Sequence, residues 1–438
     1  MRTASPRLAW VAEIRDPIHG YIDVTEVERE IIDSPFLQRL RRIHQLAGAY
    51  LVYPGATHTR FEHVLGAMNF AGQLANSISA GFELDDDDAQ EIRLAALLHD
   101  VGHGPFSHMF DEVLSTLKGL THEDASQDII RRSEINDILE KHGFSARSVS
   151  RLAVGKKDGP SFMNEIIAGG LSADLMDYLL RDSYFTGVEY GRVDVHRVIN
   201  SVCVIDNHLA IDQASIPAFE AMLLARYQMF TNVYFHRTVR AAQLMLVHAM
   251  QLADGELHLT DISDPEDYLT LTDEAVLERL TRLSPSSRQN SEARALALDF
   301  RGRHLVKCVY EEAVRKKHGP ASQLIGDEAV RARTARVLAK AAGVDPMHVY
   351  IDVPTTPAFP YTPSKERLTS LPTFRREGGK KVVPELVPME NLQLLRSISG
   401  FVNIVRIYTK AEHRGVVEGV AERLLGQTKH ERKRTALK

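Results

Sequence analysis

The chain has little of several features that would place it in a specialised class of protein. Its 438 residues include only two cysteines, Cys203 and Cys308, which cannot form a disulfide framework and lack metal-site spacing. No stretch of about 18 apolar residues is present, and residues 1–15 hold no continuous apolar segment, so neither a membrane span nor a secretory signal is expected. These absences predict a cytoplasmic protein that has no membrane partner.

A strong excess of charge of either sign is also absent. The 53 Lys and Arg residues against 58 Asp and Glu residues give a formal net charge of −5, which argues against a protein that coats nucleic acid. The one basic cluster, formed by Lys429, Arg432, Lys433 and Arg434, is interpreted as a solvated tail, with a weak phosphate contact as the alternative. Nucleic acid is therefore not expected as a partner.

Apolar residues recur mainly at helical spacing, which predicts a mostly α fold. We expect one helical catalytic domain over 1–340 and a smaller C-terminal α+β lobe over 341–438, where strand-like segments follow a Pro-rich stretch. Two short strands around Asn207 predict a hairpin. Helices are expected over residues 36–46, 60–80, 85–100, 106–118, 123–131, 171–186, 194–202 and 215–253, with a closing helix from 411.

Histidine is concentrated in one part of the chain. Six of the 19 histidines lie between His58 and His122, and among them His63, His99 and Asp100 offer two imidazoles and a carboxylate. Such a mixed set suits a divalent transition metal, and it leaves the choice among Mn, Fe, Zn, Ni and Co open. Asp174 is the best candidate for a fourth ligand. Mg²⁺ is possible together with a bound nucleotide.

The remaining histidines of this region predict contacts with an anionic substrate, because four ligands already fill one metal site. His108 and Asp111 are three residues apart on one helix face, where the carboxylate could orient the imidazole and raise its pKa, as suits a general acid. Arg60, three residues before His63, could bind a phosphate through its guanidinium. A surface position is the alternative for both Asp111 and Arg60.

A second polar pattern runs through an otherwise apolar helix, SADLMDYLLRD, at three- and four-residue steps. Asp177 and Arg181 could belong to a buried structural network, which is the alternative to a role in the site. Tyr178 and Asp182 are expected to contact a sugar.

Several strings resemble the HD-domain phosphohydrolases, and most closely their deoxynucleoside triphosphate (dNTP) triphosphohydrolases. They include RDPIHGYI, DSPFLQRLRRIHQL, YPGATHTRFEHVLG, HDVGHGPFSHMFD, THE at 121–123 and DLMDYLLRD, with RGRHLVK and IVRIYTK as weaker matches. The resemblance implies an HD-type helical core and hydrolysis of a dNTP to the deoxynucleoside and inorganic triphosphate.

The resemblance also implies roles for individual residues. The implied metal ligands are His63, His99, Asp100 and Asp174. The implied catalytic residues are His108, Asp111 and His122. The implied substrate contacts are Arg60 and His103 to phosphates, Gln45 and Leu46 to base and sugar, Tyr178 and Asp182 to the sugar 3′-hydroxyl, and His236.

An activating nucleotide such as GTP or dGTP and assembly into a homotetramer are further features that the resemblance implies. The residues that match this effector site are Asp33, Gln38, Arg41 and Arg303, whereas Glu13 stands where a lysine is expected. In the substrate site Leu175, Asn232 and Arg240 depart from the family pattern. The loss of two cations should weaken the grip on a triphosphate unless Arg237 or Arg240 substitutes.

Two other functions stay open at this point. One is an HD-type phosphomonoesterase or phosphodiesterase that acts on another nucleotide. The other is a non-catalytic scaffold that senses nucleotides or binds single strands.

Overall fold

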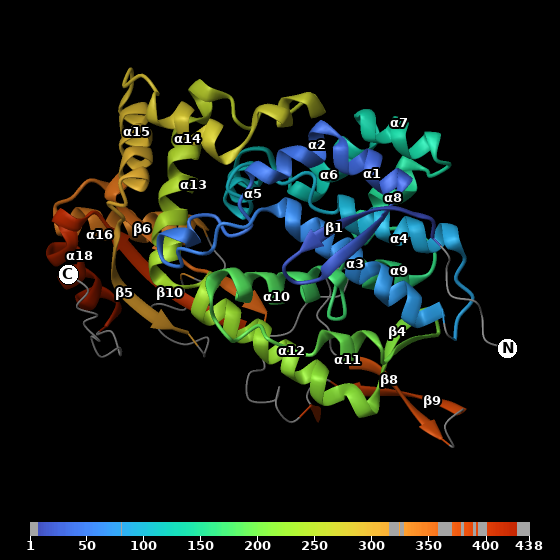
Figure 1. Ribbon diagram of the computed structural model, residues 1–438. Helices are drawn as coiled ribbons and strands as arrows, with labels where there is room; N and C mark the ends of the chain where they lie inside the picture. Colours follow the sequence, from blue (N-terminus) through green and yellow to red (C-terminus); the bar gives the residue numbers. More distant parts are fainter. Residues whose placement is uncertain are drawn as a thin grey trace.

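Figure 1 shows the computed structural model of the chain. It describes residues 8–79, 81–314, 324, 328–357, 370–377, 381–388, 391–392 and 401–426. The basic cluster at 429–434 lies outside these residues, so its expected role as a solvated tail stays a prediction.

A helical core surrounds α3 (Arg60–Ser79), which packs against both α4 and α10. Most side chains of α3 are buried, and its small residues Gly66, Ala67, Ala71 and Ala75 let the neighbouring helices approach closely. The other helices of the first half are α1 (Glu26–Asp33), α2 (Pro35–Arg39), α4 (Asp86–Leu98), α5 (His108–Lys118), α6 (His122–Arg132), α7 (Glu134–Lys141), α8 (Ala146–Ala153), α9 (Ser161–Ile167), α10 (Ala173–Thr186) and α11 (Val195–Ile199).

The helix expected over 36–46 is shorter than predicted. α2 ends at Arg39 and continues only as a 3₁₀ turn, Leu40–Arg42. The chain then turns away because His44 forms a β-bridge with Thr59 and its backbone N–H donates to Asp273. This departure brings the segment around Gln45 beside the start of α3.

The single helix expected over 215–253 is also wrong. The structure has α12 (Ile216–Met229), a π-helical turn (Phe230–Tyr234) and α13 (Arg237–Leu257). The break has a clear physical cause: the Phe235 N–H donates to the carbonyl of Phe230, five residues back, and His236 is extended rather than helical. The interruption turns the aromatic residues of 230–235 toward a cavity described below.

Within the part of the chain that the structure describes, three small sheets accompany the helices, and no strand is longer than nine residues. The expected hairpin around Asn207 is present as β3 (Val202–Ile205) and β4 (His208–Asp212). β8 (Ser370–Glu377) runs parallel to β4 and pairs with β9 (Lys381–Pro388), so a C-terminal segment returns to the helical core. The first sheet is the N-terminal hairpin of β1 (Trp10–Asp16) and β2 (Gly20–Thr25).

The C-terminal lobe is built on β10 (Phe401–Thr409), which lies between β5 (Lys307–Ala313) and β6 (Val349–Asp352) and also pairs with β7 (Thr355–Pro357). Two helices share an apolar cluster with this sheet, α16 (Glu328–Ala342) and α18 (Arg414–Leu425). A further pair, α14 (Asp273–Thr281) and α15 (Arg288–Arg301), packs on α13.

The expectation of a mostly α fold with a smaller α+β lobe is confirmed. The sheet of that lobe already includes β5, which precedes residue 340, while the division into domains at that residue stays a prediction. Within the described residues, no helix combines the length and the apolar character needed to cross a membrane.

Candidate metal and substrate site

The four residues predicted as metal ligands come from the ends of three helices. His63 lies on the first turn of α3, where the side chain of Glu62 accepts from the backbone N–H of Thr59 and fixes the helix start. His99 caps the end of α4 and Asp100 follows it, while Asp174 lies on the first turn of α10 after the N-cap Ser172. Helix ends hold these side chains rigidly and still leave space beside them.

The structure brings these four side chains together. His63, His99 and Asp100 each offer a ligand atom within 4.8 Å of the others. Asp174 Oδ1 lies 3.1 Å from His63 Nε2 and 3.8 Å from His99 Nε2, so it reaches both imidazoles. His99 Nε2 is also 3.3 Å from Asp100 Oδ1. The set contains the mixed nitrogen and oxygen donors that divalent transition metals accept.

The electrostatic field at this cluster favours a cation. Burial lowers the pKa of His63, but hydrogen bonds to Asp174 and Asp177 outweigh it and raise that pKa to about 10. Burial raises the pKa of Asp100, yet the guanidinium of Arg60 and the imidazoles of His99 and His103 hold it well below its ordinary value. The carboxylates therefore remain ionised around the two imidazoles.

The hydrogen bonds of the two imidazoles also fit a bound metal ion. His63 donates from Nδ1 to Asp177 Oδ2 at 2.8 Å, and His99 donates from Nδ1 to the carbonyl of Ala96 at 2.7 Å. Because Nδ1 makes the outward hydrogen bond in each ring, Nε2 is the nitrogen that faces the cluster and would lose its proton to bind a cation. His99 Nε2 is buried and has no hydrogen-bond partner. A divalent cation would give that atom the partner it lacks.

A buried ionic network, which the sequence left open as the alternative for Asp177 and Arg181, stands behind His63. Arg181 donates to both carboxylate oxygens of Asp177 at 2.8 and 2.9 Å and to Asp16 at 2.8 Å. His19 Nε2 lies 2.8 Å from Asp177 Oδ1. Sequence reasoning missed His19 and Asp16, although both lie within the RDPIHGYI string.

A glycine makes room for this network on α3. A Cβ atom on Gly66 would collide with Asp177 Oδ1 and with the guanidinium of Arg181. The close approach of α10 to α3, and with it the orientation of His63, requires a residue without a side chain at this position.

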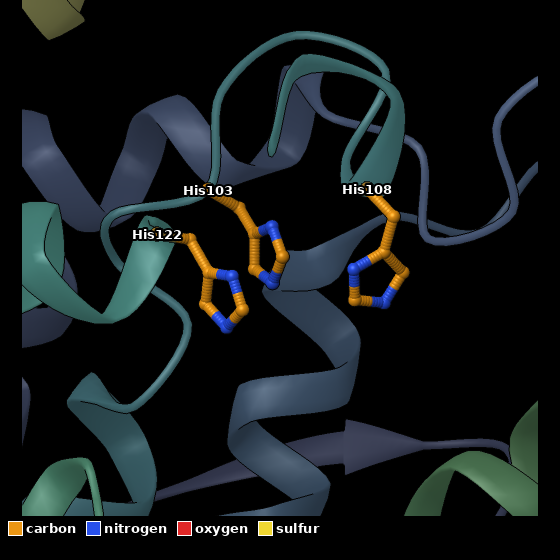
Figure 2. A group of neighbouring side chains, drawn as sticks. All are labelled: His103, His108 and His122. Atoms are coloured by element: carbon orange, nitrogen blue, oxygen red, sulfur yellow. The ribbon is translucent and has the colours of Figure 1, made fainter. Parts of the chain in front are cut away.

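Figure 2 shows His103, His108 and His122 facing a common space, with His103 and His122 side by side. The rings of His103 and His122 are stacked, with centroids 3.9 Å apart. His103 Nε2 lies 3.3 Å from Asp100 Oδ1, which joins this group to the candidate metal ligands.

The expected pairing of Asp111 with His108 is wrong. Asp111 instead lies 2.9 Å from His122 Nδ1 and also accepts from the His122 backbone N–H at 2.7 Å. His108 is partly exposed to the cavity, but desolvation of its ring by the surrounding protein and the neighbouring Arg60 guanidinium lower its pKa to about 4, so the expected rise does not occur. The first turn of α5 and the start of α6 meet in space, a tertiary contact that helical spacing within α5 could not reveal.

Arg60 is held over the same space by the loop that precedes α5. Its Nε donates to Ser107 Oγ at 2.8 Å, and its Nη1 pairs with Asp100 Oδ2. Phe106 and Ser107 have positive φ angles, and contacts with Asp273 and with the carbonyl of His44 hold this strained loop in place. The Nη2 of Arg60 is buried without a partner, so it is available to a phosphate oxygen.

A cavity of about 560 Å³ opens beside these groups. Its size is within the range of pockets that hold small molecules. Of the residues predicted from the sequence, it is lined by Gln45, Leu46, Arg60, His99, Asp100, His103, His108, His122, Asp174, Tyr178, Asp182 and Arg240. His63 and Asp111 stand behind Asp174 and His122, which they contact directly.

The predicted sugar contacts lie on one wall of the cavity. Asp182 accepts from the hydroxyl of Tyr234 at 2.7 Å, and its other oxygen lies 2.8 Å from His58 Nε2. Burial raises the pKa of Tyr178, so its phenol stays protonated and can donate a hydrogen bond. Gln45 Oε1 is buried without a partner. Sequence reasoning missed Tyr234 and His58; the π-helical turn brings Tyr234 to this wall.

Three residues near the start of α13 lie at or beyond the rim of the cavity: Asn232 and Arg240, which depart from the family pattern, and His236, which matches it. Arg240 lines the cavity, but Asp352 of β6 binds its guanidinium at 2.7 and 3.1 Å. His236 lies at the start of α13, where its ring packs edge-on against Tyr53, and it is not among the described residues that line the cavity. Asn232 bonds to the carbonyl of Gln228.

Of the four expected effector residues, two are in contact with each other. Arg41 donates to Gln38 at 2.9 Å, and both are near Asp33 along the chain. Arg303 donates instead to the carbonyl of Leu51. All of these side chains except the half-buried Gln38 are exposed.

Two family models match the chain. The HD domain matches residues 60–182, which include the four candidate ligands, and the HD associated region matches residues 193–436. The chain belongs to the HD-domain phosphohydrolases. Within this family its similarity is strong to the dNTP triphosphohydrolases.

Three relatives illustrate this similarity. An uncharacterized protein of Methanocaldococcus jannaschii is 38% identical over 61% of this chain and 57% of its own length. An uncharacterized protein of Bacillus subtilis is 35% identical over 60% of this chain and 64% of its own length. The deoxynucleoside triphosphate triphosphohydrolase SAMHD1 of Homo sapiens is 31% identical over 68% and 55%. The chain thus spans about three-fifths of the length of these relatives.

Solved structures of two bacterial proteins share the fold. A hypothetical protein from Aquifex aeolicus superposes with a TM-score of 0.73 at 27% identity, over 93% of this chain and 99% of that one. A phosphohydrolase from Bacteroides thetaiotaomicron superposes with a TM-score of 0.71 at 24% identity, over 91% and 99%. At 24% identity, the similarity to the Bacteroides protein shows a shared fold and no more.

Proposed function

We propose that this HD-domain phosphohydrolase is a metal-dependent dNTP triphosphohydrolase, which releases a deoxynucleoside and inorganic triphosphate. One observation carries the proposal: a cluster suited to a divalent cation opens onto a cavity of nucleotide size that unpartnered cationic and imidazole groups line. The name and similarity of SAMHD1 support the same substrate class.

The candidate ligands His63, His99, Asp100 and Asp174 would hold the cation. A divalent ion supplies charge neutralisation to phosphate oxygens and lowers the pKa of a water molecule. The buried Nη2 of Arg60 has no partner and is placed to donate to a phosphate oxygen. His103, whose Nε2 faces Asp100, lines the cavity beside it. Their role is to position the triphosphate for attack by water on its α-phosphorus.

Proton transfer to the leaving sugar oxygen is assigned to His122. Asp111 holds the Nδ1–H of His122, so Nε2 faces the cavity and can carry the proton that the leaving oxygen takes. His108, whose pKa is lowered to about 4, is neutral at physiological pH and acts as a hydrogen-bonding group beside it.

Recognition of the nucleoside is assigned to the opposite wall. Tyr178 and Asp182 would bind the sugar 3′-hydroxyl, and Gln45 and Leu46 would contact the sugar and base. His236 is placed outside this cavity, so a role for it would require a movement of the α13 start. Activation by GTP or dGTP through Asp33, Gln38, Arg41 and Arg303, and assembly into a homotetramer, belong to the same proposal.

The decisive experiment measures products. The purified chain is incubated with Mn²⁺ or Mg²⁺ and each dNTP, with and without GTP, and the nucleoside, triphosphate and orthophosphate are quantified. We expect nucleoside and triphosphate in equal amounts, and no turnover in a His99→Ala variant. The absence of nucleoside under every combination would refute the proposal.

A phosphomonoesterase or phosphodiesterase that acts on another nucleotide is the second candidate. It is favoured by the small number of free cations near the cavity. Asp352 neutralises Arg240, and Leu175 supplies no positive charge after Asp174. Fewer free cations suit a substrate that has fewer phosphates. Orthophosphate release from a nucleoside monophosphate, without triphosphate release from any dNTP, would favour this alternative.

A further inference from the structure

A strongly basic hollow lies outside the catalytic cavity. Four cationic side chains and one amide line a depression of about 460 Å³, and among the described residues its lining includes no carboxylate: Gln127, Arg131, Arg147, Arg151 and Lys156. A concentration of positive charge in a chain whose formal net charge is −5 needs a physical explanation.

The hollow is formed by two helices that pack against each other, α6 and α8 (Figure 1). Gln127 and Arg131 are four residues apart on α6, and Arg147 and Arg151 are four residues apart on α8, so each pair shares one helix face. Lys156 follows the end of α8. The helices thus hold three guanidinium groups and one ammonium group around a common space.

Two of the cations are not neutralised. Arg131 donates only to the backbone carbonyl of Gln127, and Arg147 forms no ion pair with any described residue. The other two have carboxylate partners outside the lining: Arg151 pairs with the exposed Asp158, and Lys156 pairs with Glu123. A guanidinium group can donate two parallel hydrogen bonds to one phosphate group. Several guanidinium groups around one space therefore suit an anion that has several phosphates.

The hollow adjoins the catalytic cavity. α6 begins at His122 and reaches Arg131 nine residues later, a distance of about 13 Å along the helix. Glu123, the partner of Lys156, lines the cavity, as do Ala153 and Val154 at the end of α8. An anion bound to Lys156 would compete with Glu123 and alter the cavity rim.

We propose that this hollow is a second binding site for a polyphosphate anion, distinct from the catalytic cavity and coupled to it through the Lys156–Glu123 ion pair. Inorganic triphosphate is the natural probe. Its identity as a product rests on the proposed function, whereas the site itself rests on the charges and contacts of α6 and α8.

The test is calorimetric titration of inorganic triphosphate into the full chain at low ionic strength. The test variant carries Arg131→Gln and Arg147→Gln together. The control carries Arg132→Gln and Arg192→Gln, which remove the same charge from exposed, already paired arginines outside the hollow. We expect two binding events per chain in the parent and control, and weakening of one event by at least about tenfold in the test variant.

Further arms of the experiment separate the possible anions. Orthophosphate should bind the hollow far more weakly than triphosphate, and a dNTP should displace only the triphosphate bound in the cavity. Displacement of both triphosphates would mean that the hollow binds the phosphates of a nucleotide instead. The site would be overturned if the test variant weakened none of the binding events seen in the parent.

Failure of the proposed function gives a different pattern. If no dNTP is hydrolysed but triphosphate binding is weakened only in the test variant, the second site is supported and the triphosphohydrolase proposal is refuted. If dNTPs are hydrolysed, triphosphate should inhibit the parent in a partly non-competitive manner and the test variant in a purely competitive one. Melting temperatures of both variants, whose altered side chains are exposed, should stay close to that of the parent.

Discussion

Asp111 Oδ2 lies 2.9 Å from His122 Nδ1 and its Oδ1 accepts from the backbone N–H of the same residue, so one carboxylate fixes both the ring and the backbone of His122. Burial raises the pKa of Asp111, but the hydrogen bonds from His122 bring it below its ordinary value, which keeps the carboxylate ionised. The carboxylate on α5 therefore determines which nitrogen of an imidazole on α6 faces the cavity.

Replacement of Asp111 by Asn should lower turnover far more than substrate binding. Asn can present its amide to Nδ1 and favour the wrong tautomer, so proton transfer from Nε2 is lost, at a cost of about 10²–10⁴ in kcat. Steady-state kinetics with a dNTP and Mn²⁺ provide the measurement. Asp128→Asn, a surface carboxylate on α6, is the control and should change kcat less than about twofold. Equal losses in both variants would contradict the assignment.

Asp177 is expected to govern metal affinity without being a ligand. Asp177→Asn removes the charge that orients His63, which should weaken metal binding by about 10–100-fold. It also leaves the buried Arg181 poorly paired, at a cost of about 3 kcal/mol in unfolding free energy. Metal analysis and competition with a chelator provide the readout.

Asp16→Asn is the matched control for this prediction. It removes the other carboxylate of Arg181, so it should destabilise the fold by a similar amount and keep the parent's metal affinity. If both variants lose metal equally, the loss reflects stability and not the contact between Asp177 and His63.

Acid should destabilise the fold through buried neutral histidines. Burial lowers the pKa of His248, whose ring lies 4.8 Å from that of Tyr350, to about 4, against about 6.5 in the unfolded chain. The unfolded state therefore binds the extra proton between these values, and stability falls as the pH drops from about 6.5 to about 4. The expected contribution is about 2 kcal/mol by pH 4.5.

Urea unfolding of the parent and of His248→Gln at pH 7.5 and pH 4.5 checks this prediction. The variant should lose less free energy on acidification than the parent does, because the glutamine does not titrate. An identical pH dependence in the two proteins would show that His248 titrates normally in the folded state.

The ion pair of Arg240 and Asp352 should link α13 to the C-terminal sheet. Asp352→Asn leaves a buried guanidinium short of a partner, and we expect a loss of about 3–5 kcal/mol in unfolding free energy. Arg240→Gln combined with Asp352→Asn should recover part of this loss, because neither partner is then left charged and alone. A double-mutant cycle measured by denaturant unfolding gives the coupling, and additive effects would argue against it.

Much of this site could be predicted from short strings of sequence, because helix ends fix where their residues point. His63, His99, Asp100 and Asp174 come from three helix termini, and each terminus has a cap or turn signal nearby. The clustering of histidines between 58 and 122 indicated the chemistry. Their mutual distances follow from the packing of α3, α4 and α10.

The parts that could not be predicted depend on contacts between distant segments. Helical spacing predicted a contact between Asp111 and His108. In the structure α6 packs beside α5, and Asp111 contacts His122 instead. In the π-helical turn at Phe230–Tyr234, a backbone N–H bonds to the carbonyl five residues back and not four. The spacing of apolar residues in this stretch does not reveal that change. Strand β5 pairs with β10 some ninety residues later, and no local pattern encodes such a partner.

The bare backbone of α3 at Gly66 has a practical consequence for reading genomes. A methyl group introduced there, as in Gly66→Ala, would push Asp177 away and change the orientation of His63, while all four candidate metal ligands remained present. A sequence could then carry the complete signature of its family and still be inert, so counting ligands alone would overestimate how many such proteins work.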